Sequence, residues 1–349
     1  MIEDKKLVEA LKGKKEEVME DDIETLEDIT LEDVMEDEQL VEYPDIQKEP
    51  YSEHSLITID KEYEEEEDNL FEPIPTGFKQ LDDILVGGLM PTNLYIFSGK
   101  PGIGKSTFCI QMMQQIAAQK HKVIYATSEM NKRVIMFKLY NLVFAINQAQ
   151  RGYDLDDTFN INNLSIFEEL IHKKFKDAKK KKLYEDIKNN YLKEFGKYIY
   201  IIKTKKTQEV IDIVKAHPDS VLISDFIQKL EPKRTYQSDK QKVDEVLKEL
   251  DELKDDCKIP IIAISSLNRT GYNSNKQEKM SSLKESGDLE SDATAIFEIT
   301  QGDNDIPSDT LTKQISIKCA KNRFGELCDF KATYYPNYGI FTKFDKEKK

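Results

Sequence analysis

The sequence predicts an α/β fold in which a mostly parallel central sheet is flanked by helices and preceded by an acidic segment without a fixed structure. Short apolar runs typical of buried strands alternate with helical stretches through most of residues 92–300. The composition also changes near residue 73, where a strongly acidic stretch gives way to a mixed chain. We therefore expect residues 1–72 to be largely disordered and residues 73–349 to form one domain.

The acidic segment carries most of the charge of the 349-residue chain. Residues 1–73 contain 28 Asp and Glu against 7 Lys, a net charge of −21, so the remainder carries +6 and the whole chain −15. Segments with this much charge and few aromatic residues bury too little apolar surface to offset the entropy lost on ordering. Two interpretations stay open for it: a solvated tail, or a segment that docks a partner or regulates the folded domain.

Composition excludes several classes of protein. No apolar run approaches the roughly 20 residues that a membrane-spanning helix needs, and the first residues do not resemble a signal peptide. The cysteines are scattered without a CxxC pair, which argues against a metal site and suits free thiols in a reducing cytoplasm. We expect a cytoplasmic protein without a membrane segment. The cysteines are Cys109, Cys257, Cys319 and Cys328.

The folded domain begins with turn-forming residues, which are followed by a predicted strand and a glycine-rich loop. Residues 74–78 and 87–91 are rich in Pro and Gly and flank a short helical stretch. An apolar run at 94–97 predicts a buried strand, and residues 107–119 have the pattern of an amphipathic helix. Between them, residues 99–106 satisfy the G-x-x-x-x-G-K-[ST] pattern in full, in the strand–loop–helix context that this motif requires.

This phosphate-binding loop, or P-loop, predicts a site for ATP. Its glycines let backbone N–H groups approach the phosphates, and the N-terminus of the following helix adds a positive dipole. Lys105 supplies a charge to the β- and γ-phosphates, and the Ser106 hydroxyl binds Mg²⁺. With the strand and the helix both in place, a chance match is the weaker interpretation. The predicted nucleotide-binding residues are Gly99, Pro101, Gly102, Ile103, Gly104, Lys105, Ser106 and Thr107.

Two carboxylates that follow predicted strands complete the chemistry. Glu129 lies just beyond a strand over 122–126, and Asp225 ends an apolar strand over 221–225, which is the Walker B arrangement. Ligands bind outside the carboxyl ends of parallel strands, so both side chains can face the P-loop. We expect Asp225 to hold Mg²⁺ together with Ser106, and Glu129 to be the general base that polarises the attacking water. Taken alone, either residue would be an ordinary loop carboxylate.

Motifs near the ends of the strands carry a family resemblance. In order and in spacing, residues 73–343 resemble the ATPase domain of DnaB-type replicative helicases. The narrowest motifs are ESG at 285–287 and KNRFG at 321–325. The other matching segments are 75–78, the P-loop, 128–130, 224–228, 265–269, 283–287 with Glu290 and Asp292, and 320–325. Further strands are predicted at 260–265, 314–320 and 330–334.

The resemblance implies a RecA-like P-loop core that assembles into a ring, usually a homo-hexamer, and threads single-stranded DNA during DNA replication. It also implies that ATP is hydrolysed at the interfaces between subunits, where the residues matching Lys321 and Arg323 act on a neighbour's nucleotide. The chemistry agrees, because a cation at a strand end can neutralise the charge that develops on the γ-phosphate. In this setting, the acidic segment would dock a replication partner.

Two departures from the family pattern keep a second function open. Ser266 stands where the family usually has a Gln that senses the γ-phosphate, and the acidic segment stands in place of a folded N-terminal collar domain. The alternative to a helicase is a regulatory or assembly ATPase, similar to RecA or KaiC, that does not unwind DNA. A module that binds nucleotide only for structure is a third interpretation, against which the intact Lys105, Ser106, Asp225 and Glu129 argue.

Two loops match those that line the DNA channel in the family. Lysine and arginine side chains there are candidates for phosphate contacts, and tyrosine rings are candidates for stacking on bases. The candidates are Lys233, Arg234 and Tyr236 in the first loop (231–241), and Tyr272, Lys276 and Lys279 in the second (271–280). A lysine-rich stretch at 173–182, in a predicted helical insertion, is either a solvated helix face or a patch for nucleic acid or a partner.

Overall fold

The computed structural model describes residue 56 and residues 72–155, 165–266, 292–302 and 312–346. The chain divides into two units, Met1–Asp68 and Asn69–Lys349, and all helices and strands named below lie in the second. The acidic segment lies almost entirely outside the described residues. Its predicted disorder, and the division of the chain into a tail and one domain, therefore stay predictions.

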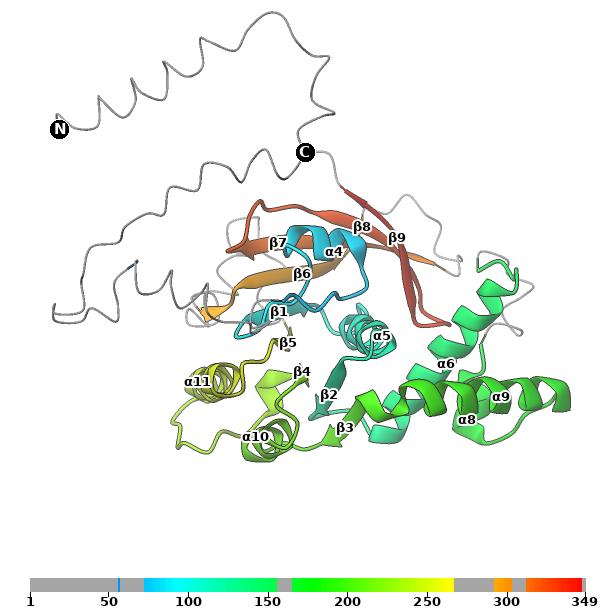
Figure 1. Cartoon of the computed structure of the whole chain (residues 1–349), viewed down its shortest axis with the longest axis horizontal. Helices are drawn as coiled ribbons and strands as arrows, with labels where there is room; N and C mark the ends of the chain where they lie inside the picture. Colours follow the sequence, from blue (N-terminus) through cyan, green and yellow to red (C-terminus); the bar gives the residue numbers. More distant parts are fainter. Residues whose placement is uncertain (1–55, 57–71, 156–164, 267–291, 303–311, 347–349) are drawn as a thin grey trace, which may run out of the picture. The chain divides into compact units, whose positions relative to one another are not determined.

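A nine-stranded sheet forms the centre of the part of the chain that the structure describes. Its strands are β1 (Leu94–Gly99), β2 (Lys122–Thr127), β3 (Ile199–Lys203), β4 (Ser220–Asp225), β5 (Ile261–Ser266), β6 (Ala295–Gln301), β7 (Lys313–Asn322), β8 (Phe330–Tyr335) and β9 (Ile340–Lys346). They lie in the order β3-β2-β4-β5-β1-β6-β7-β8-β9 (Figure 1). Pairing is parallel from β3 through β6 and antiparallel from β6 to β9. The mostly parallel α/β fold predicted from the sequence is confirmed.

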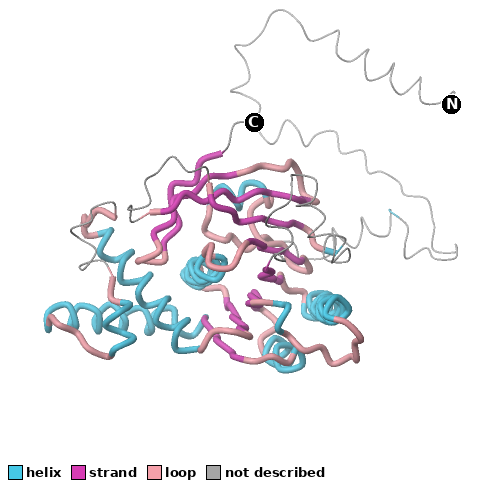
Figure 2. The backbone as a smooth tube through the Cα atoms, turned by 180° about the vertical axis from the view of Figure 1, so that it is seen from behind, coloured by secondary structure: helices cyan, strands magenta, loops and turns pink. Residues whose placement is uncertain are grey.

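Helices cover both faces of this sheet. They are α4 (Lys79–Ile84), α5 (Lys105–Ala118), α6 (Lys132–Gln150), α8 (Phe167–His172), α9 (Ala178–Phe195), α10 (Thr207–Lys215) and α11 (Asp239–Cys257), with short 3₁₀ turns η3 (Gly196–Tyr198) and η4 (Ile227–Lys229). Figure 2 shows the strands between α5 on one side and α10 and α11 on the other. Phe108 of α5 and Leu139 of α6 belong to one buried apolar cluster, and Val210 of α10 and Leu250 of α11 to a second. All residues of β1 and β4 are buried, as expected for central strands covered on both faces.

The insertion between β2 and β3 is helical in its described residues, as predicted. Helices α8 and α9 pack on α6 around Phe144, Leu170 and Ile187 in a third apolar cluster. Lys180, from the lysine-rich stretch, pairs with Glu169 at 2.7 Å, and its side chain is only 15% exposed. This lysine therefore ties α9 to α8 and is not part of a solvated face.

The carboxyl ends of four central strands meet at one edge of the sheet. Gly99 at the end of β1 lies beside Ser266 at the end of β5, and Thr127 at the end of β2 lies beside Asp225 at the end of β4. The segments that follow these strands leave the sheet at the same edge, where ligands of open parallel sheets bind. We call this the P-loop edge.

Candidate nucleotide-binding site

The P-loop leaves β1 and turns directly into α5, which begins at Lys105. Gly104 caps this helix in a left-handed conformation, with φ of 113°. A Cβ atom at Gly104 would also lie 3.0 Å from Cζ of Phe341, on β9. The backbone angle therefore requires glycine at this position, and the tight approach of Phe341 also favours it. The loop presents the N-terminus of α5 at the P-loop edge, as the sequence motif predicts.

Lys105 is almost buried, with 9% of its surface exposed. Its ammonium group donates hydrogen bonds to the carbonyl oxygens of Gly99 at 2.6 Å and Lys100 at 3.0 Å. Burial lowers the pKa of Lys105, and the nearby carboxylates of Asp225 and Glu129 partly oppose this effect. The P-loop therefore surrounds the buried Lys105 ammonium group, which is hydrogen-bonded only to neutral carbonyl groups in the contacts given above.

Asp225 ends β4 with a side chain that is buried beside the P-loop. Its carboxylate accepts a hydrogen bond of 2.8 Å from the Tyr125 hydroxyl and another from the Ser106 side chain. Burial raises the pKa of Asp225, although both hydrogen bonds and the charge of Lys105 favour the ionised form. Hydroxyl and carboxylate oxygens are ligands that Mg²⁺ prefers, so the meeting of Ser106 and Asp225 fits this ion.

Glu129 follows β2, and its side chain is about half exposed. The hydroxyl oxygen of Thr127 accepts hydrogen bonds from the backbone N–H groups of Glu129 and Met130, which fixes the turn after the strand. The carboxylate pairs with Lys229 of η4 at 3.1 Å, and the Lys229 ammonium lies 5.0 Å from the centre of the Phe226 ring. Glu129 interacts electrostatically with both Lys105 and Asp225. The structure thus brings together Lys105, Ser106, Asp225 and Glu129, which the sequence predicted separately.

Thr107, the last predicted nucleotide-binding residue, faces a cavity of about 720 Å³. Lys138 of α6 donates a hydrogen bond of 3.4 Å to the Thr107 hydroxyl, and burial lowers the pKa of Lys138. Asn141 and Phe167, from α6 and α8, contribute to the cavity lining. Sequence reasoning missed this cavity, because the segments that line it lie far apart in the chain and carry no joint motif.

Ser266 lies at the P-loop edge, next to Gly99. The side-chain amide of Gln228, on η4, donates hydrogen bonds to the Ser265 hydroxyl at 2.6 Å and the Ser266 carbonyl at 3.3 Å. A glutamine from the neighbouring strand end therefore lies beside the serine. Gln228 lies in the segment 224–228 that matches the family, but no sequence motif assigns it a place in the site.

Lys321 and Arg323 lie at the other edge of the sheet. Asn322 ends β7 beside Ala295, and Ala295 in turn lies beside Tyr95 near the start of β1. Because a strand rises about 3.3 Å per residue, the end of β7 is more than about 10 Å along the strands from the P-loop. The two cations therefore lie away from the chain's own P-loop.

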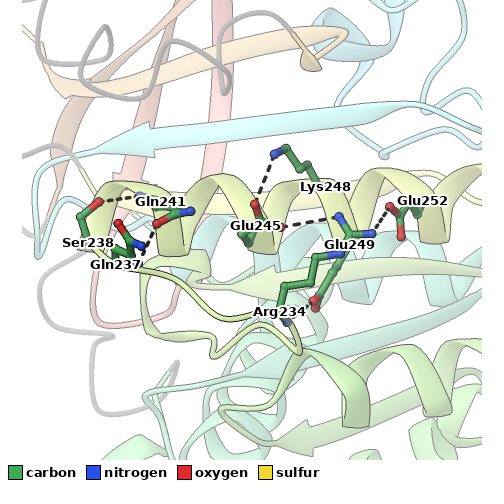
Figure 3. Close-up of polar contacts among 8 residues, drawn as sticks. All are labelled: Arg234, Gln237, Ser238, Gln241, Glu245, Lys248, Glu249 and Glu252. Atoms are coloured by element: carbon green, nitrogen blue, oxygen red, sulfur yellow. Dashed lines mark hydrogen bonds and ion pairs between the residues drawn. The ribbon is translucent and has the colours of Figure 1, made fainter.

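The first predicted DNA loop is tied to α11 (Figure 3). The Arg234 guanidinium pairs with Glu252 at 2.8 Å and with Glu245 at 3.6 Å. One oxygen of Glu249 accepts the backbone N–H groups of Lys233 at 2.7 Å and Arg234 at 3.2 Å. The charge of Arg234 is thus largely matched within the chain.

Other predicted residues lie outside the described part of the chain. They are Lys276, Lys279 and Tyr272 of the second DNA loop, the motif at 283–287, and Glu290. Among the described residues, no group of three or more His, Cys, Asp or Glu side chains could hold a metal ion, and the four cysteines are free thiols. No helix in the described ranges is long and apolar enough to cross a bilayer.

The sheet order and the loop between β1 and α5 define a P-loop nucleotide-binding domain of the RecA-like class. Residues 73–344 match the DnaB-like helicase C terminal domain, and the chain belongs to this family. The resemblance seen in the sequence motifs is confirmed.

Individual relatives agree with this assignment. The chain is 26% identical over 278 residues to the replicative DNA helicase DnaB of Buchnera aphidicola subsp. Baizongia pistaciae (strain Bp), covering 79% of this chain and 56% of that relative. It is 25% identical over 297 residues to the replicative DNA helicase DnaB of Leifsonia xyli subsp. xyli (strain CTCB07), covering 84% and 61%. The match thus spans little more than half the length of these relatives.

A solved structure shares the fold. It is that of a DnaB-like replicative helicase, described with its interactions with primase. The TM-score is 0.64 at 19% identity, and the likeness covers 83% of this chain and 68% of that chain.

Proposed function

We propose that this protein is an ATP-hydrolysing helicase or translocase that acts on single-stranded DNA in DNA replication as a ring of identical subunits. One observation carries the proposal: Lys105, Ser106, Asp225 and Glu129 gather at the P-loop edge of a domain from the DnaB-like family. The curated relatives named above are replicative DNA helicases. A domain that bound nucleotide only for structure would not need Glu129 in addition to Ser106 and Asp225.

Each residue of the site then has a role in the reaction. The Lys105 ammonium exchanges its two carbonyl partners for oxygens of the β- and γ-phosphates, and the N–H groups of residues 99–107 enclose the phosphates. Ser106 and Asp225 hold Mg²⁺, which neutralises phosphate charge when bound. Glu129 takes the proton of the attacking water as general base.

The position of the two cations supports the proposed ring. Lys321 and Arg323 lie at the edge of the sheet away from the P-loop of the same chain. Copies that pack head to tail would bring that edge of one molecule to the P-loop edge of the next, and such heterologous contacts form a ring when the rotation between copies closes. We propose that the ring is a hexamer, in which Arg323 and Lys321 from a neighbouring subunit complete each nucleotide-binding site.

DNA contacts are proposed for Lys233 and Arg234 of the first loop and for Lys276 and Lys279 of the second. Contact with DNA would exchange the carboxylate partners of Arg234 for phosphate oxygens, a substitution of one anion for another. The acidic segment at residues 1–72 is proposed to dock a replication partner.

The test is the rate of ATP hydrolysis with and without single-stranded DNA, measured beside unwinding of a forked duplex. The proposal expects DNA to stimulate hydrolysis and expects the fork to be unwound only with ATP. Hydrolysis that is indifferent to DNA, with no unwinding, would contradict it. That outcome would favour the regulatory or assembly ATPase, an alternative that Ser266 at the usual glutamine position supports.

A further inference from the structure

Tyr125 belongs to none of the predicted motifs, yet its hydroxyl lies inside the candidate site. The residue is in β2 and is fully buried. The hydroxyl oxygen is 2.8 Å from Oδ2 of Asp225 and 3.5 Å from the carbonyl oxygen of Ser106. A hydroxyl has one proton to donate, and the shorter distance lies within the usual range for O–H···O bonds while the longer does not. The proton is therefore donated to Asp225.

The register of the sheet explains how a mid-strand residue reaches the end of its neighbour. Tyr125 lies beside Ile223, and Asp225 lies two residues further along β4. Side chains two apart in a strand face the same side, so Ile223 and Asp225 share a face, and Ile223 and Tyr125 both belong to the apolar cluster under α5. The length of the tyrosine ring carries its hydroxyl forward to the carboxylate. A phenylalanine would fill the same space without making the bond.

The chemistry of this hydroxyl limits what it can do. A tyrosine hydroxyl has an ordinary pKa of about 10, well above neutral pH. The phenol therefore stays protonated at neutral pH and serves as a fixed donor. The residue is fully buried in the apolar cluster between the sheet and α5.

We propose that Tyr125 is a positioning residue that orients the Asp225 carboxylate for Mg²⁺. The inference rests on the proposed function, in which Ser106 and Asp225 hold the ion. A hydrogen bond to one carboxylate oxygen stops rotation of the group and keeps it aligned with Ser106. Outer partners of metal ligands commonly contribute 10- to 100-fold, as an order of magnitude, to metal affinity.

Two conservative variants of the full chain test the proposal. Tyr125→Phe removes only the hydroxyl that contacts Asp225. Tyr95→Phe is the matched control, since Tyr95 is also fully buried in a central strand and its hydroxyl accepts a hydrogen bond of 2.8 Å from the Met90 N–H group. The measurement is binding of a fluorescent ADP analogue as Mg²⁺ is titrated, with thermal melting of each variant recorded in the absence of metal.

We expect Tyr125→Phe to raise the half-saturating Mg²⁺ concentration by roughly tenfold or more, within the range known for outer partners. Its affinity for the analogue without Mg²⁺ should stay unchanged, and Tyr95→Phe should keep the wild-type Mg²⁺ requirement. An unchanged Mg²⁺ requirement in Tyr125→Phe would overturn the inference. So would an equal rise in both variants.

Two further results keep the test decisive. If Tyr125→Phe is less stable than the wild type, the titration is run at a temperature where its melting curve shows it folded, and the variant must show the same Mg²⁺ deficit there. If the wild-type protein binds the analogue without regard to Mg²⁺, the proposed function itself fails. That failure is visible in the wild-type titration alone and is therefore distinct from failure of the role of Tyr125.

Discussion

At the scale of single residues, the candidate nucleotide-binding site is most clearly recognised by Asp225, a carboxylate that is buried. Its pKa is raised because two hydrogen bonds and the charge of Lys105 do not fully offset the desolvation of the carboxylate. At any pH above the raised pKa, the ionised carboxylate therefore makes the folded protein less stable. Active sites commonly sacrifice stability in this way.

Replacing Asp225 should separate stability from function. In Asp225→Asn the buried charge is gone, while Tyr125 can still donate to the side-chain oxygen. We expect a higher melting temperature at neutral pH in the presence of a chelator, together with loss of ATP hydrolysis. Each kcal/mol gained corresponds to roughly 2–4 °C for domains of about 150–250 residues. A lower melting temperature than wild type, measured by calorimetry, would show that the carboxylate stabilises the fold.

Glu129 and Lys229 form an ion pair, but their contributions to catalysis should differ greatly. Glu129→Gln keeps the shape and loses the base, so kcat should fall by at least about 100-fold while nucleotide still binds. Lys229→Met removes only an exposed partner, and such pairs contribute at most about 1 kcal/mol, or roughly fivefold in rate. Steady-state kinetics on both variants checks this order. Near wild-type hydrolysis by Glu129→Gln would mean that another group is the base.

At the scale of elements, the first predicted DNA loop and helix α11 offer a matched comparison. Arg234 and Lys248 both pair with Glu245, and their side chains are 52% and 51% exposed. Only Arg234 is on the loop. We expect Arg234→Ala to weaken binding of single-stranded DNA and to reduce the slope of log affinity against log salt by about 1. Lys248→Ala should change neither, as measured by fluorescence anisotropy across salt concentrations. If both variants weakened DNA binding equally, the cause would be the change in the net charge of the protein and not the loss of a contact between Arg234 and DNA.

Local signals in the sequence were enough to predict the elements around the P-loop. Two strands combine an apolar run with a chemical motif: the strand before the P-loop and the Walker B strand that ends at Asp225. Both end at the predicted residue or within two residues of it. Strands β3, β6 and β9 have no such motif and are not among the predicted strands. Their place depends on pairing with distant segments, as for β6 beside β1, which no local pattern encodes.

The site itself was predictable where one residue type has one strong chemical use. Lys105, Ser106 and Asp225 follow from the motif and the strand ends. Tyr125 and Lys229 do not, because a tyrosine in a strand has the pattern of a core residue and a lysine after a strand that of a surface residue. Only the register between β2 and β4 and the turn of η4 bring these side chains to Asp225 and Glu129.

At the scale of the whole molecule, one sheet separates two halves of a proposed active site. The P-loop is at one edge, and Arg323 follows the end of β7 at the other. In the proposed assembly, each site therefore receives Arg323 from a neighbouring copy. Activity of this chain should depend on assembly with further copies, in which both edges of every subunit are used.

Mixing two inactive variants tests this account most directly. Glu129→Gln retains Arg323 but lacks the base, and Arg323→Ala retains the base but lacks the cation for its neighbour. In a mixed ring, an intact Glu129 site can receive Arg323 from a Glu129→Gln neighbour. With equal amounts and random assembly, about one interface in four is complete in a head-to-tail ring. The account predicts recovery of about a quarter of wild-type ATP hydrolysis on mixing. No recovery, with mixed assemblies demonstrated by co-purification of two tags, would contradict it.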